Sequence, residues 1–196
     1  MIKDARIEHE KKYDATSYTI GRGVAMQLYS GKPFYPEDPR VEDIDIQDIA
    51  QALSMTTRYG GHVTDFYSVA EHSVHMSNIV SEENAFIALM HDATEAYIGD
   101  LVRPIKYLFP EFQRLEDNIW FIIATKYGLP IELPDEVKNH DVKICFTERS
   151  QILNYTGETD WGYEMESHDI SIMNWTPEQA KAMFLNRFYD LYEADK

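Results

Sequence analysis

The chain carries the run HDATEAYIGD at residues 91–100, and this run ends a stretch with the periodicity of a helix. The predicted helix extends from about residue 83 to residue 97, and Gly99 follows it, where glycine commonly ends a helix. One face of this helix should be buried, because apolar side chains recur on it at helical spacing, namely Phe86, Met90, Ala93 and Tyr97. The run therefore predicts a helix with polar side chains at the border of a buried face.

Three of these polar side chains have the chemistry of a metal site. His91, Asp92 and Glu95 point into one sector of the predicted helix, since residues three and four apart lie about one turn apart. Imidazole and carboxylate groups together can hold a divalent metal, and another candidate ligand, His72, lies 19 residues upstream of His91. Glu95 then remains as a spare carboxylate, which would hold or deprotonate a water on the metal, as a hydrolase requires.

Helical periodicity and capping signals predict the other main elements, and the fold class is all-α. A helix should run from about Asp45 to Met55, and the capping box Ser68-Val69-Ala70-Glu71 should start a helix that carries His72. Further helices are expected from just after Pro110 to Tyr127, from Asp135 to about Asn154, and after the cap Thr176-Pro177-Glu178-Gln179.

The segments outside these helices have different compositions. Residues 18–35 contain glycines and β-favouring residues, which predict a small strand pair with loops. The polar stretch 155–174 should be a long loop, which serves as a lid, as an assembly surface or as an ordinary excursion. We therefore expect a single domain, with a β/loop segment over 1–42, a helical core over 43–154, and a loop with a C-terminal helix over 155–196.

Length, charge and cysteine content restrict the class of protein. The 196 residues suit one domain with a full core, and the lone Cys145 cannot form an intramolecular disulfide. The formal charge of −16 argues against a nucleic acid polymer as partner. No apolar run approaches the ~20 residues of a membrane helix, and the first residues lack the features of a secretion signal. We expect a cytoplasmic protein without a membrane partner, in the host cytoplasm if it is phage-encoded.

The chain contains two His-Asp dipeptides, and the residues that follow them differ. The pair at 91–92 precedes Glu95 and Asp100, whereas Val142-Lys143-Ile144 follows the pair at 140–141. His72, the first pair and Asp141 resemble the H…HD…D signature of HD-domain phosphohydrolases. The run HDATEAYIGDLVRPIKY is similar to one in bacterial HD-domain 5′-deoxynucleotidases, and DIAQALSMTTRYGGHVTDFYSVAEHS to one in phage and bacterial relatives. Phage dATP triphosphohydrolases are also similar, and the resemblance spans about residues 28–153.

The resemblance implies an HD-domain helical bundle with a metal centre. Its ligands would be His72, His91, Asp92 and Asp141, with His140 as the rival of Asp141. Two imidazoles and two carboxylates suit one divalent transition metal per chain, Co²⁺, Mn²⁺, Zn²⁺, Ni²⁺ or Fe²⁺, better than they suit an all-oxygen Mg²⁺ or Ca²⁺ site. A triphosphate substrate would allow additional Mg²⁺ to bind. His75 lacks motif context and is not expected to be a ligand.

The resemblance also assigns roles around that centre. Asp92 and Glu95 would be catalytic, with Glu95 orienting or activating water. The substrate contacts would be Arg58 and Lys106 to phosphate, Asp100 to the sugar 3′-hydroxyl, and Tyr59 and His62 along the pocket. The alternatives are that Arg58 and Lys106 are solvated surface charges and that Tyr59 belongs to the core.

One departure from the bacterial deoxynucleotidases affects the sugar pocket. In those proteins a tryptophan and a proline follow the arginine, whereas Tyr59, Gly60 and Gly61 follow Arg58 in this chain. Sugar and base selectivity therefore stay open at this point.

The expected function is metal-dependent hydrolysis of (deoxy)nucleoside phosphates. Attack at the phosphorus next to the sugar would release a nucleoside and either phosphate or a polyphosphate. One alternative is another HD-type reaction, on a phosphodiester or a guanosine polyphosphate. The other is a catalytically silent HD-fold nucleotide-binding module, which should have lost Glu95, Arg58 or a metal ligand, although all are present. The partners expected are a small nucleotide and, from the resemblance, further copies of the chain in a homo-oligomer.

Overall fold

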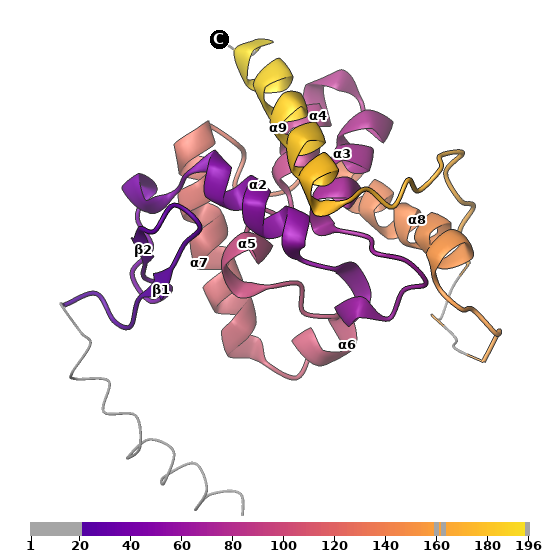
Figure 1. Ribbon diagram of the computed structural model, residues 1–196, viewed down its shortest axis with the longest axis horizontal. Helices are drawn as coiled ribbons and strands as arrows, with labels where there is room; N and C mark the ends of the chain where they lie inside the picture. The colour runs from indigo at the N-terminus through magenta and orange to yellow at the C-terminus, as the bar shows by residue number, and fades with distance from the viewer. Residues whose placement is uncertain (1–20, 159–160, 162–163, 195–196) are drawn as a thin grey trace, which may run out of the picture.

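The computed structural model describes residues 21–158, 161 and 164–194, and most regular structure in them is helical (Figure 1). Strands β1 (Met26–Gln27) and β2 (Pro33–Phe34) form an antiparallel pair. The helices are α2 (Ile46–Met55), α3 (Val69–Ile79), α4 (Ala85–Met90), α5 (Glu95–Ile98), α6 (Arg103–Lys106), α7 (Pro110–Tyr127), α8 (Asp135–Ile152) and α9 (Pro177–Ala194), with 3₁₀ turns at Val41–Asp43, Arg58–Gly61 and Glu82–Asn84. The predicted all-α fold with a short strand pair is confirmed; residues 18–20 of the predicted strand segment lie outside the described ranges.

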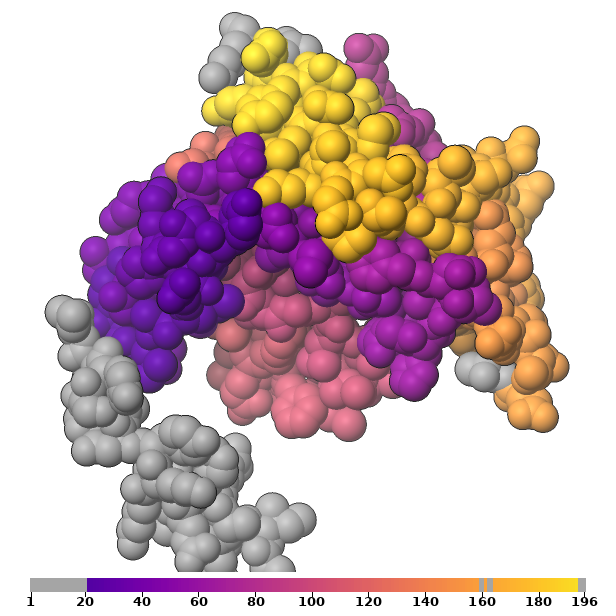
Figure 2. Space-filling view, in the orientation of Figure 1, coloured from indigo at the N-terminus to yellow at the C-terminus, as the bar shows by residue number. Residues whose placement is uncertain are grey.

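Helix α9 closes one face of the bundle. It packs on α2, α3 and α4, and in the space-filling view it covers the helices behind it (Figure 2). Phe184 and Phe188 of α9 are buried in a core shared with α2, α3, α4 and α7. Burial of one such side chain contributes roughly 1.5–3 kcal/mol. Helix α3 contacts α8 as well, so that His72 and Asp141 come from neighbouring helices.

The helix ends largely follow their sequence signals. Ser68 accepts a hydrogen bond from the backbone N–H of Glu71 at 3.1 Å, which is one half of the predicted capping box. The other half is absent from the described hydrogen bonds, because the Glu71 carboxylate accepts instead from the backbone N–H groups of Met173, Asn174 and Trp175, at 2.7 to 3.0 Å. The box at Thr176 and Gln179 is complete.

The prediction of one continuous helix from residue 83 to residue 97 is wrong. Helix α4 ends at Met90, residues 91–94 form a tighter turn, and α5 begins at Glu95. Backbone bonds in the turn span three residues, as from Glu95 N–H to the Asp92 carbonyl at 3.0 Å. His91 Nδ1 lies 2.8 Å from the carbonyl oxygen of Ala88, the oxygen that a regular helix would offer to the Asp92 N–H. This side-chain bond competes with the helical one and accounts for the break.

The described residues between α8 and α9 contain neither helix nor strand, as predicted for a long loop. Across the described ranges, none of the helices is both long enough and apolar enough to cross a bilayer.

Candidate active site

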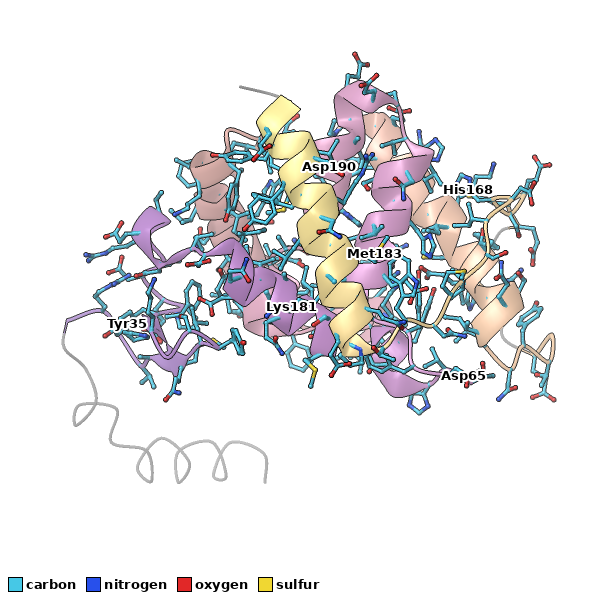
Figure 3. The ribbon with its side chains drawn as sticks, turned by 45° about the horizontal axis from the view of Figure 1, so that its top comes forward. Tyr35, Asp65, His168, Lys181, Met183 and Asp190 are labelled. Atoms are coloured by element: carbon cyan, nitrogen blue, oxygen red, sulfur yellow. The ribbon has the colours of Figure 1, made fainter. Side chains whose placement is uncertain are left out.

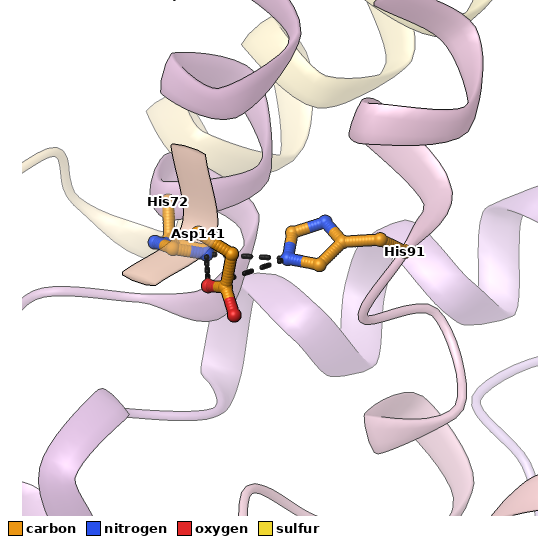
Figure 4. Close-up of side chains that lie close together, drawn as sticks. All are labelled: His72, His91 and Asp141. Carbon is orange, nitrogen blue, oxygen red and sulfur yellow. Dashed lines mark hydrogen bonds and ion pairs between the residues drawn. The ribbon is translucent and has the colours of Figure 1, made fainter. Parts of the chain in front are cut away.

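Four predicted ligands meet between α3, α8 and the turn after α4. The Nε2 atoms of His72 and His91 are 3.4 Å apart, and Asp141 Oδ1 lies 3.4 Å from the first and 3.8 Å from the second (Figure 4). Asp92 Oδ2 lies 3.6 Å from His72 Nε2 and 3.3 Å from His91 Nε2. The structure thus brings together side chains that are up to 69 residues apart in the sequence, from His72 to Asp141.

The outer nitrogens of both histidines are held by acceptors. His72 Nδ1 donates to Glu148 Oε1 at 2.6 Å, and His91 Nδ1 donates to the Ala88 carbonyl at 2.8 Å. A carboxylate and a carbonyl can only accept, so each Nδ1 carries a proton and each Nε2 directs a lone pair at the centre in the neutral ring. This is the arrangement by which proteins orient metal-binding histidines.

The charges around the centre also suit a cation. Burial and the charge of Arg58 lower the pKa of His72, but Glu148 and Asp141 outweigh them and raise it to about 9. Burial raises the pKa of Asp141, yet its contacts with His72 and His91 hold it well below its usual value. Burial lowers the pKa of His91 as well, but Asp92 and Asp141 outweigh this effect and raise the value. The surroundings thus favour positive charge at both imidazoles and an ionised Asp141, and the same donor set fits a divalent metal.

Arg58 lies beside this centre and is almost fully buried, so it is not the solvated surface charge of the alternative interpretation. Its Nη1 is 3.4 Å from Asp92 Oδ2, and its Nη2 is 3.3 Å from Glu148 Oε2. A bridge between Thr57 and Ser68 fixes the turn that carries Arg58 against the start of α3. A cation is thereby held beside Asp92, one of the predicted ligands.

Glu95 is buried, and its Oε2 has no hydrogen-bond partner among the described residues. Burial and the charges of Asp92 and Asp100 raise the pKa of Glu95, whereas Arg58 and Lys106 lower it. Burial likewise raises the pKa of Asp100. The Lys106 ammonium pairs with Glu116 at 2.8 Å. A phosphate would therefore have to compete with the Glu116 carboxylate for this ammonium.

Tyr59 and His62 occupy the turn after Arg58 and point to different surroundings. The Tyr59 hydroxyl donates to Glu148, which turns this side chain towards the interior and favours the interpretation of a core residue. Its backbone φ of 57° is in the left-handed region, which a non-glycine residue seldom adopts. His62 is exposed at the end of the turn, and no hydrogen bond or ion pair described here joins it to the four predicted ligands.

Comparison with known proteins shows the family of this chain. The model of the YfbR-like 5′-deoxynucleotidases matches residues 57–155, a range that contains each of the residues considered above as ligands or substrate contacts. The chain belongs to this family. As a YfbR-like protein of the HD superfamily it is a hydrolase, and its family typically binds a divalent metal.

Relatives of this YfbR-like chain occur in two bacteria. The uncharacterized protein YfdR of Escherichia coli strain K12 is 40% identical over 177 residues, which cover 87% of this chain and 97% of YfdR. An uncharacterized protein of Rhodobacter capsulatus is 34% identical over 123 residues, 58% of this chain and 63% of that protein.

Two charged residues of the YfbR-like region lie near the predicted ligands but were not predicted from the sequence. Glu148 is wholly buried and bonded to His72, Arg58, Tyr59 and Tyr67. Burial raises the pKa of Glu148, but Arg58 and His72 outweigh it and hold the value at about 2. A signal existed, because Glu148 lies seven residues, or about two helical turns, after Asp141. Arg103 is half-exposed, 4.0 Å from Asp141 Oδ2, within the run that carried the resemblance.

The side chains of His140 and Asp141, the two candidates for the fourth ligand, point in different directions. The His140 ring stacks on His168 with centroids 4.9 Å apart, and His140 Nδ1 lies 3.2 Å from His168 Nε2. His168 belongs to the loop beside α8 (Figure 3). Adjacent residues on this helix therefore face different partners, and only Asp141 faces His72 and His91.

We expect Asp141→Asn to weaken metal binding and activity together, whereas His140→Ala leaves both largely intact. The loss in metal affinity should exceed the roughly 10- to 100-fold that removal of an outer partner typically costs. Metal titration and steady-state kinetics on both variants measure this. Loss of the metal in His140→Ala but not in Asp141→Asn would show that the fourth ligand is misassigned.

Proposed function

We propose that this protein is a metal-dependent phosphohydrolase of deoxynucleoside phosphates that attacks the phosphorus next to the sugar. The observation that supports it best is the convergence of two Nε2 atoms and two carboxylates beside the buried guanidinium of Arg58. Membership in the YfbR-like 5′-deoxynucleotidases supports the class of substrate. The products are a nucleoside and phosphate, or a polyphosphate if the substrate is a triphosphate.

The proposed metal ligands are His72, His91, Asp92 and Asp141, and their mixed nitrogen and oxygen donors fit one divalent transition metal. When bound, the metal would lower the pKa of a coordinated water and offset charge on the phosphate oxygens.

The side chains around the ligands divide the remaining work. Arg58 presents a cationic fork that matches phosphate oxygens and fixes the phosphorus for attack. Glu95 accepts the proton of the attacking water, which is the task of a general base. The bond between phosphorus and the sugar 5′-oxygen then breaks. This oxygen takes up one proton, which balances the proton that Glu95 accepted from the water, and the nucleoside leaves. Asp100 binds the sugar, and Lys106 adds positive charge near the phosphate.

Hydrolysis in ¹⁸O-labelled water tests this assignment of the attacked atom. The protein is incubated with deoxynucleoside mono- and triphosphates and, in separate reactions, with each divalent metal, and the products are analysed by mass spectrometry. We expect the label in the released phosphate or polyphosphate and none in the nucleoside. A triphosphate that yields a diphosphate and free phosphate would place the attack at the terminal phosphorus and contradict the proposal.

A further inference from the structure

The carboxylate of Glu148 sits behind the centre, on the side away from solvent. It is 0% exposed and projects from α8, the helix that also carries Asp141. Its Oε1 accepts from His72 Nδ1 at 2.6 Å and from the Tyr67 hydroxyl at 2.8 Å. Its Oε2 accepts from Arg58 Nη2 at 3.3 Å and from the Tyr59 hydroxyl. Two carboxylate oxygens offer about four lone-pair sites, so these four donors saturate the group.

This saturation excludes a direct role in the reaction. With all lone pairs engaged and no exposed surface, Glu148 has no means of touching a substrate. Each of its oxygens instead holds one functional side chain of the proposed site: Oε1 holds His72, and Oε2 holds Arg58. The other end of the guanidinium, Arg58 Nη1, lies 3.4 Å from Asp92 Oδ2. Because Glu148 holds Nη2, it also influences where the guanidinium lies relative to Asp92.

We infer that Glu148 is a positioning residue that fixes the metal-binding nitrogen of His72 and the phosphate-binding fork of Arg58 relative to each other. The inference rests on the proposed function, because it concerns the same site. It makes one side chain responsible for two separable properties, metal affinity and substrate affinity. Loss of Glu148 should therefore change both, although it touches neither metal nor substrate.

Glutamine at this position keeps the shape but replaces one oxygen with an amide NH₂. That donor must face either His72 and Tyr67 or Arg58 and Tyr59, which are themselves donors, so at least one of the two pairs loses its acceptor. Removal of an outer partner of a metal ligand typically costs 10- to 100-fold in metal affinity or activity. We expect a loss of this size in Glu148→Gln, with a higher KM for the nucleotide.

Glu71 provides a matched control. It is also 0% exposed and precedes His72 in the chain, but its carboxylate accepts from the backbone of residues 173–175 and approaches His75. Glu71→Gln thus disturbs a buried, hydrogen-bonded carboxylate of the same core without touching His72 Nδ1 or Arg58. A purely structural role of Glu148 would make the two variants alike, with lower melting temperatures and unchanged metal affinity in the folded protein.

The experiment titrates Co²⁺ or Zn²⁺ into wild type, Glu148→Gln and Glu71→Gln without substrate, at a temperature where circular dichroism shows all three folded. Metal affinity reduced 10- to 100-fold in Glu148→Gln alone supports the inference. A loss of less than about 10-fold in Glu148→Gln, or an equal loss in Glu71→Gln, overturns it. The readout needs no turnover, so an inactive wild type would count against the proposed function and not against the positioning role.

A second measurement on the wild type covers the case in which Glu148→Gln does not fold. Long-range ¹H–¹⁵N NMR of the Zn²⁺-loaded protein reports which ring nitrogen of His72 carries the proton. A hydrogen-bonded proton on Nδ1, absent from the spectrum of His72→Asn, is the expected result. A proton on Nε2 instead would show that Glu148 does not set this ring, and the inference fails.

Discussion

The substitutions His91→Ala and Asp92→Ala are each expected to abolish hydrolysis and bound metal while leaving most of the helical fold. His91 supplies one of the two Nε2 atoms that meet at 3.4 Å, and Asp92 Oδ2 is within 3.6 Å of both. The fold should survive, because the main core is formed by apolar side chains of α2, α3, α4, α7 and α9 and does not include these residues. Elemental analysis of the metal, nucleotide turnover and circular dichroism measure the three properties.

His75→Ala is the control for this test. His75 is a mostly buried histidine on α3, one turn from His72, but its ring stacks on Trp175 and its Nε2 faces Glu71 at 3.4 Å. It should keep the metal and the activity even if the protein loses some stability. Stoichiometric metal and full turnover in His91→Ala or Asp92→Ala would remove the central claim of a metal-dependent site.

The second large effect is expected in Glu95→Gln, which should retain the metal and slow turnover by ~10² to 10⁴. The amide has nearly the same shape as the carboxylate, so the buried position stays filled, but it cannot accept the proton of the attacking water. Glu95 Oε2 has no partner in the described structure, so the substitution removes no described hydrogen bond of that atom. Single-turnover kinetics at saturating metal and substrate isolate the chemical step from product release. An unchanged single-turnover rate would assign Glu95 a structural role.

The sequence carried enough information to predict most of the helices and the four side chains that converge, but not the break between α4 and α5 or the short helix α6. His91, Asp92 and Glu95 lie in one short run, and His72 lies in another run after a capping signal, so local pattern sufficed for them. Asp141 was harder to assign, because its partner His140 carries the same type of ligand and only the packing of α8 decides which one faces α3.

What the sequence could not predict depends on side-chain direction and on competition for hydrogen bonds. The role of Glu148 requires knowledge that α8 lies against α3, since its spacing of seven residues from Asp141 places both on one side of α8 but does not link it to His72 or Arg58. Tyr59 follows Arg58 in a turn with left-handed backbone, and neither this φ of 57° nor the hydrogen bond from its hydroxyl to Glu148 can be read from the residue type. The break after Met90 escaped prediction, because apolar periodicity does not register that His91 takes the Ala88 carbonyl.

That break bears on any attempt to transplant the site into another scaffold. Neighbouring residues on a regular helix diverge by about 100°, and His140 and Asp141 on α8 accordingly face different partners. His91 and Asp92, in the tight turn, reach the same centre. A designer who grafted the ligands onto an ideal helix, with every sequence spacing kept, would replace the backbone on which His91 and Asp92 reach this centre together. The irregular turn and its Ala88 acceptor would have to be copied along with the ligands.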